Sequence, residues 1–168
     1  MKPKWPIGIF IASAVVLVSA FLPWGSMQAS FKIALHDTPL AGLPERAFGN
    51  LDPFKGIVVT MTGWNGSLEL GGLTLPNWLV VVAALAISAF CALRAASVWE
   101  VHPIVNILLA SYGIFHCVAL ALVLLSNSGR VNVGLIATLL AFITMAIVLA
   151  RAYRASQTSP NPEPTAEP

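Results

Sequence analysis

Four long apolar runs dominate this chain, and they decide what it can fold into. The runs cover about residues 6–24, 77–98, 103–126 and 131–152. Each approaches the roughly 20 residues with which a helix crosses about 30 Å of hydrocarbon. Inside hydrocarbon a backbone must satisfy its own hydrogen bonds, so we expect these runs to be transmembrane helices. The runs lack the ten-residue alternation that barrel strands require.

Composition supports the membrane class and excludes several others. Hydrophobic residues make up 57% of the 168 residues, and charged residues only 10%, where a soluble chain carries about 25%. A net charge of +2 is too small for a phosphate-binding patch, so nucleic acid is not an expected partner. We therefore expect an all-α membrane protein, a four-transmembrane-helix bundle in contact with the lipid bilayer of a cell membrane, the bacterial inner membrane.

The runs belong to one predicted domain, residues 1–155. Short connections join the last three runs, which makes those helices antiparallel neighbours. A long connection, residues 25–76, separates the first run from the second. The end of the chain, residues 156–168, contains four prolines and no large apolar residue, and we expect it to be a disordered tail.

The first run has a second interpretation. Two lysines precede it and Val18-Ser19-Ala20 resembles a signal-peptidase site, so it could be a cleaved secretory signal. Its length and its Pro23-Trp24 end favour a retained helix.

Basic residues near the span ends predict the orientation. With both termini in the cytoplasm and residues 25–76 outside, five basic residues face inward and four face outward. The inner set is Lys2, Lys4, Arg94, Arg151 and Arg154, and the outer set is Lys32, Arg46, Lys55 and Arg130.

Residues 25–76 are predicted to hold a small extracytoplasmic β-sheet or hairpin. Residues 30–35 and 57–62 alternate in the two-residue period of half-buried strands. Asn65-Gly66 is a strong hairpin signal, so residues 67–70 are expected to return beside 57–62. Gly71-Gly72 and Pro76 are expected to break the chain before the second span.

Five tryptophans attract attention because indoles prefer the headgroup level of a bilayer. Four of them stand at predicted span ends, where interfacial anchoring explains them: Trp5, Trp24, Trp78 and Trp99. Trp64 lies instead at the predicted turn of the outer loop. An exposed indole there, with Asn65, is a candidate partner-binding site, although it could also fold back onto the sheet.

His116 lies near the middle of the third run, where ionisable groups are expensive and often functional. Tyr112 shares its helix face. One hypothesis makes His116 a haem or chlorin ligand, with Met145 as a conceivable second axial ligand. The simpler hypothesis is a neutral imidazole hydrogen-bonded to a neighbouring helix, with no cofactor.

Small residues repeat along two runs at helical spacing, a pattern that lets helices approach closely in lipid. We expect the two faces to meet each other. They are Ala84, Ser88, Ala92 and Ala96 in the second run, and Ala110, Gly113, Cys117 and Ala121 in the third.

The order of elements resembles the claudin-type tetraspan architecture, with Gly63-Trp64 echoing the first-loop signature of that family. The Leu22-Pro23-Trp24 end of the first run also resembles many small uncharacterised bacterial four-helix membrane proteins, a resemblance that implies no activity.

No catalytic motif is found in the sequence, so we expect no enzyme. The leading hypothesis is an accessory or scaffold subunit that acts by contact with other membrane subunits or with itself. The alternatives are a pigment- or haem-associated subunit using His116, and a small oligomeric transporter or channel.

Overall fold

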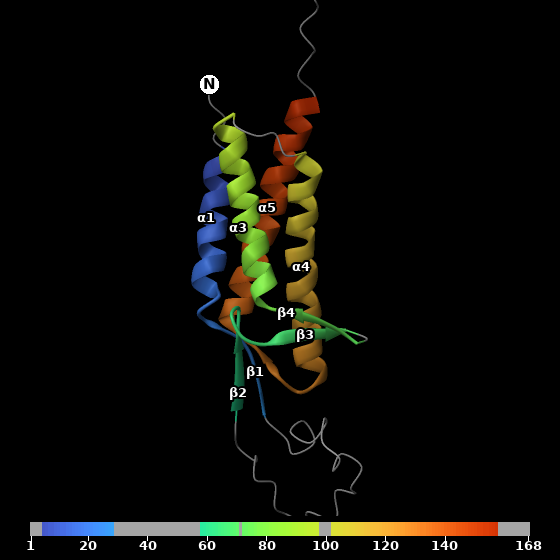
Figure 1. The fold of residues 1–168 in the computed structure, drawn as a ribbon. Helices are drawn as coiled ribbons and strands as arrows, with labels where there is room; N and C mark the ends of the chain where they lie inside the picture. The colour runs from blue at the N-terminus through green and yellow to red at the C-terminus, as the bar shows by residue number, and fades with distance from the viewer. Residues whose placement is uncertain (1–4, 29–57, 71, 98–101, 158–168) are drawn as a thin grey trace, which may run out of the picture.

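The computed structural model describes residues 5–28, 58–70, 72–97 and 102–157, and these residues form four helices and five short strands. The helices stand side by side, and the strands gather at the end of the bundle opposite the N-terminus (Figure 1). The helices are α1 (Trp5–Ser19), α3 (Trp78–Ala95), α4 (Pro103–Ser126) and α5 (Val133–Gln157). The strands are β1 (Pro23–Gln28), β2 (Val58–Thr62), β3 (Ser67–Leu70), β4 (Leu73–Pro76) and β5 (Arg130–Val131).

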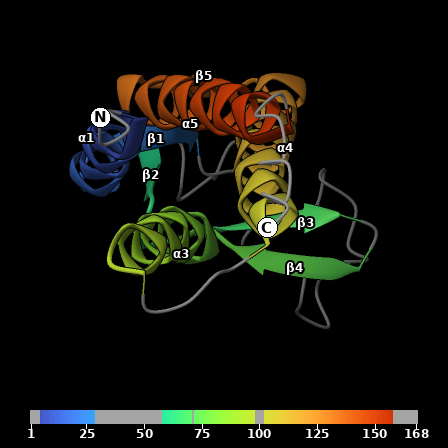
Figure 2. The same ribbon diagram turned by 90° about the horizontal axis from the view of Figure 1, so that it is seen from above.

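Among the described residues, three helices are long and apolar enough to cross a membrane: α3, α4 and α5. The apolar helix α1 is shorter, with 15 residues. Helix α1 packs against α3 and α5, and α4 packs against the same two helices. Figure 2 shows this ring from above, with α1 and α4 at opposite corners.

The first predicted span is longer than the helix that forms. The prediction placed it at residues 6–24, whereas α1 ends at Ser19 and residues 23–28 are strand β1. Pro23 explains the early end, because proline disfavours helical geometry in the residue before it and cannot donate to a helix. The fourth helix is longer than predicted and reaches Gln157, two residues into the expected tail. The rest of that tail lies outside the described residues.

The helices carry large apolar side chains on their outer faces as well as between them. Examples of exposed residues, one from each helix, are Ile7, Leu85, Leu122 and Leu140. The side chains between the helices are also apolar, as Ile87, Leu120 and Phe142 illustrate. Helices that are apolar all round are typical of a membrane protein, and the structure has that character.

The strands form two small sheets, whose pairing differs from the predicted hairpin. Strand β2 pairs antiparallel with β1, which in turn pairs with β5. Strand β3 pairs with β4 across Gly72, whose φ of +91° suits glycine. The Asn65-Gly66 turn therefore connects two sheets instead of closing one hairpin. The predicted strand at residues 30–35 lies outside the described residues.

We refer to these strands and the turn between β2 and β3 as the strand platform: residues 23–28, 58–70, 72–76 and 130–131. It contacts the helices through β1, β5 and β3, and most extensively through β1. Its attachment to the bundle positions the residues of the candidate site.

Candidate functional site

Asn77 is the central attachment point between the strand platform and the helices. It immediately precedes α3 and is fully buried. Its side-chain nitrogen donates to the backbone carbonyls of Thr62 and Asn65, both at 3.0 Å. Its backbone N–H donates to the carbonyl of Gly66 at 3.1 Å. One asparagine thus holds the whole β2–β3 turn against the start of a helix.

His116 completes this polar cluster from α4. Its Nε2 lies 3.2 Å from Oδ1 of Asn77, and its Nδ1 lies 3.4 Å from the hydroxyl of Tyr112. The amide oxygen of Asn77 can only accept a hydrogen bond, so Nε2 carries a proton in this contact. The prediction that Tyr112 lies beside His116 is confirmed. The imidazole is fully buried and hydrogen-bonded to the residue that precedes α3.

The same geometry bears on the hypothesis of a haem or chlorin ligand. Both ring nitrogens of His116 already have partners, so a bound metal would have to displace Asn77 or Tyr112. Met145 is buried among the core residues of the helices. The described residues contain no group of three His, Cys, Asp or Glu side chains placed to hold a metal ion. The ligand role of His116 stays a prediction.

His116 is central in α4 but not at the centre of the bundle. Its partner Asn77 stands at the very beginning of α3, so His116 lies at the level where α3 meets the strand platform. The ten residues from His116 to Ser126 continue α4 past that level for about 15 Å. The sequence placed His116 at mid-membrane because it could not show how the helices are staggered.

Trp24 is a core residue, which corrects the prediction that it anchors the interface. Its side chain is fully buried, and its indole N–H donates to the carbonyl of Ser19 at 2.9 Å. The ring fits between two glycines: a Cβ on Gly63 or on Gly134 would lie 2.8 Å or 2.7 Å from ring atoms of Trp24. Trp24 therefore fastens the end of α1 to the β2–β3 turn and to the start of α5. Trp78, by contrast, is 44% exposed.

Trp64 is exposed at the tip of the β2–β3 turn, as predicted, with 45% of its surface accessible. Its ring lies against that of Phe21, with centroids 5.7 Å apart, and Phe21 is itself exposed. The side chain of Asn65 has an internal role, since its Oδ1 accepts from the backbone N–H and the hydroxyl of Thr62. Of the two residues predicted to bind a partner, Trp64 presents its side chain outward, whereas the Asn65 amide oxygen closes the turn.

Three residues of the predicted small-residue stripes make contacts with α1 and α5. The hydroxyl of Ser13 in α1 donates to the carbonyl of Ala84, and the hydroxyl of Ser88 donates to Ser13. A Cβ on Gly113 would clash with the ring of Phe142 in α5. Ala84 and Ser88 of α3 thus contact α1, and Gly113 of α4 lies against α5. Of the remaining predicted packing residues, Ala110 and Cys117 are buried, Ala121 is partly buried, and Ala92 and Ala96 are exposed.

The polar residues that a transport path would require do not share one face. Thr138 bonds to Ser19 of α1 and to the carbonyl of Gly134, whereas Ser111 and Thr144 are exposed on other helix faces. Asn106 is buried in α4, and its Oδ1 has no hydrogen-bond partner. The residues are therefore scattered through the bundle.

Comparison of the chain with protein-family models, with curated proteins and with solved structures finds no match in any of the three. The resemblance to small tetraspan proteins therefore stays a prediction. Asn77 is the residue that sequence reasoning missed, because an asparagine before a helix looks like an ordinary N-cap. Its side chain makes no cap hydrogen bond here and turns to the platform instead.

Proposed function

We propose that this protein is a multi-pass membrane subunit that acts by contact, holding the strand platform in a fixed position for another membrane subunit or a second copy. The attachment of the platform supports this proposal most strongly. Asn77, His116 and Trp24 are fully buried, and the polar groups of all three form hydrogen bonds that link the strand platform to the helices. A platform fixed in this way can present Trp64 in one orientation, which lowers the entropic cost of binding.

In the proposed topology, α1 crosses the membrane together with the three longer helices, which gives four spans. Both termini lie in the cytoplasm and the strand platform lies outside. The burial of Ile9, Ala12 and Val16 supports including α1 with the three longer helices. The hydrogen bonds from α1 to Ser88 and Thr138 support a retained helix over a cleaved signal, because cleavage would strip both partners from the bundle. The bias of basic residues at the span ends supports placing the protein in the cell membrane with both termini in the cytoplasm.

Cysteine labelling tests this topology. Both natural cysteines are buried, so a cysteine introduced at an exposed position dominates the reaction. On intact cells, a membrane-impermeant maleimide should label Thr74→Cys in β4 and leave Gln157→Cys in α5 unlabelled until the cells are permeabilised. Labelling of Gln157→Cys but not Thr74→Cys in intact cells would reverse the orientation.

Trp64→Ala tests the contact function. Loss of the indole should weaken retention of the partner subunit about tenfold or more, because exposed tryptophans are typical binding hot spots. Native mass spectrometry of the protein extracted gently from its own membrane gives the fraction that keeps the added polypeptide mass. Trp78→Ala is the matched control, since Trp78 is equally exposed but stands on a helix outside the platform.

Two results would count against the contact function. One is equal retention in the wild type, Trp64→Ala and Trp78→Ala. The other is a wild-type protein that carries no added polypeptide mass after the gentlest extraction. A mass equal to that of the chain itself would identify the partner as a second copy.

A further inference from the structure

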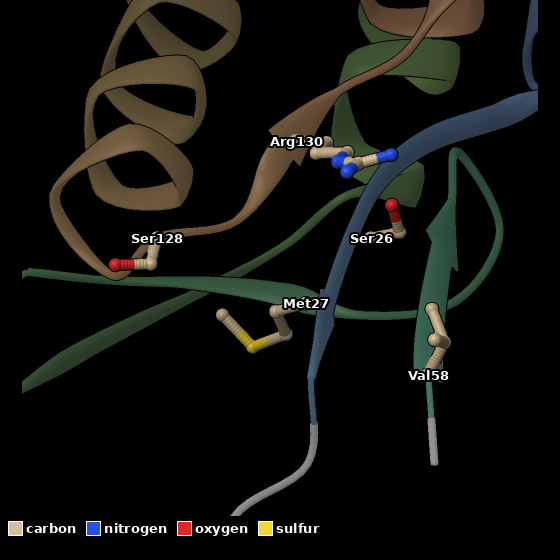
Figure 3. Close-up of a pocket in the computed structure, with 5 residues that line it drawn as sticks. All are labelled: Ser26, Met27, Val58, Ser128 and Arg130. Carbon is tan, nitrogen blue, oxygen red and sulfur yellow. The ribbon is translucent and has the colours of Figure 1, made fainter. Parts of the chain in front are cut away.

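A pocket of about 330 Å³ lies where the strand platform meets the connection between α4 and α5. Figure 3 shows the lining side chains arriving from three segments: β1, β2 and the α4–α5 connection. The lining residues are Ser26, Met27, Val58, Ser128 and Arg130. None of them belongs to the Asn77–His116 cluster or to the Trp64 turn, although all but Ser128 belong to the strand platform.

The pocket carries the positive charge of Arg130. Arg130 is exposed, and no described residue forms an ion pair or hydrogen bond with its guanidinium. The hydroxyls of Ser26 and Ser128 add two further donors, and no carboxylate stands among the described lining residues. Arginine offers a planar set of N–H donors that matches a phosphate group.

The wall of the pocket is fixed by close backbone packing. A Cβ on Gly25 would clash with Leu124, and a Cβ on Gly129 would lie 2.9 Å from the carbonyl oxygen of Leu124. The backbone N–H of Gly129 donates to that carbonyl at 2.8 Å and so closes the end of α4. These contacts hold β1 and the α4–α5 connection together, so Ser26 and Arg130 stay opposite each other in the sheet.

Ser128 occupies a backbone position that glycine usually fills. Its φ is +58°, the left-handed conformation in which helices often end on glycine. A serine tolerates this conformation less well than glycine, yet here it supplies a hydroxyl to the pocket wall. The strained position therefore adds to the pocket lined by Arg130 a polar group that a glycine could not offer.

The position of the pocket indicates where its ligand comes from. Arg130 lies between two helices that are long and apolar enough to cross a membrane, four residues after Ser126 and three before Val133. The connection stands at the platform end of the bundle (Figure 1), which the proposed topology places on the outer side of the bilayer. Within two turns of the pocket along both helices, apolar side chains are exposed: Leu122, Leu125, Val133 and Ile136.

We propose that this pocket binds the phosphate of an anionic phospholipid headgroup, with Arg130 as the main ligand and Ser26 and Ser128 as hydroxyl donors. The acyl chains lie along the exposed apolar faces of α4 and α5. A zwitterionic headgroup is a poorer ligand, because no described lining residue balances its ammonium group.

Native mass spectrometry with added lipid tests the site. The purified protein in detergent is titrated with phosphatidylglycerol, with phosphatidylcholine and with inorganic phosphate. We expect phosphatidylglycerol to bind the wild type about five- to tenfold more tightly than it binds Arg130→Gln, as loss of a charge-assisted hydrogen-bond set implies. Arg130→Lys should recover part of the difference, and Arg94→Gln, which removes the same charge near the other end of the bundle, should bind like the wild type.

Val58→Trp separates the pocket from a general charge effect, since it fills the pocket from the exposed strand β2 and leaves Arg130 intact. Weaker phosphatidylglycerol binding by Val58→Trp, with unchanged circular dichroism, supports the site. Equal lipid binding by the wild type, Arg130→Gln and Val58→Trp would overturn it. Tight binding of inorganic phosphate with no preference between the two lipids would overturn the lipid source and assign the pocket to a free phosphate.

Discussion

Replacing Asn77 with alanine is expected to lower the free energy of unfolding by about 3–5 kcal/mol. The change strips hydrogen-bond partners from Nε2 of His116 and from the carbonyls of Thr62 and Asn65. A buried polar group left without a partner costs about 1–3 kcal/mol, and water cannot replace the lost amide in the fully buried position of Asn77. Titration of the protein in mixed micelles with sodium dodecyl sulfate, followed by circular dichroism, measures the change.

Two further variants show whether the loss of stability in Asn77→Ala comes from its buried hydrogen bonds. Asn127→Ala removes a comparable amide that donates to the carbonyl of Val123 at 2.8 Å, but in an exposed position. It should cost less than about 1 kcal/mol. Asn77→Asp keeps the size of the side chain and its acceptor while losing both donors, so it should destabilise at least as much as Asn77→Ala. A loss no larger for Asn77→Ala than for Asn127→Ala would refute the central role of this cluster.

Trp24→Ala is expected to cost about 3–5 kcal/mol, the usual range for removing a large buried aromatic side chain. The substitution opens a cavity between Gly63 and Gly134 and removes one of the two hydrogen bonds that the carbonyl of Ser19 accepts, leaving the one from the backbone N–H of Leu22. The end of α1 then loses its link to the β2–β3 turn. The same detergent titration measures the effect.

Trp78→Ala serves as the control, because that indole is 44% exposed and fills no cavity of this kind. Trp24→Phe should fall between the wild type and Trp24→Ala, since it keeps most of the ring packing but cannot donate to Ser19. If the alanine variants of Trp24 and Trp78 lost the same stability, Trp24 would be an interfacial anchor and its burial in the core would be wrong.

The long helices were predictable because their signal is local. A run without charges, with the length of a bilayer crossing, needs no information from the rest of the chain. The second and third predicted spans, 77–98 and 103–126, therefore lie close to α3 and α4. The signal failed at Pro23, where a proline inside the apolar run marks the change from α1 to β1.

The candidate site could not be predicted from the sequence, because it depends on contacts between residues that are far apart along the chain. Trp24 carries the same local signal as an interfacial tryptophan, and only Gly63 and Gly134, far along the chain, reveal that it is enclosed. The Asn65-Gly66 signal indicated a turn correctly but could not say that β2 prefers β1 as its partner. His116 was recognisable as unusual in an apolar run, whereas its partner Asn77 was not.

The unequal helix lengths have a consequence for the surrounding membrane. Helices α1 and α3 are neighbours and span about 22 Å and 27 Å, whereas the neighbouring α4 and α5 span about 36 Å and 38 Å. If all four helices cross the bilayer, as the proposed topology has it, one side of the bundle matches a thin hydrocarbon layer and the other a thick one. A bilayer of uniform thickness suffers hydrophobic mismatch on at least one side and must thin, thicken or tilt the protein there. In the proposed four-span topology, a neighbouring protein that covered the short side would relieve that deformation.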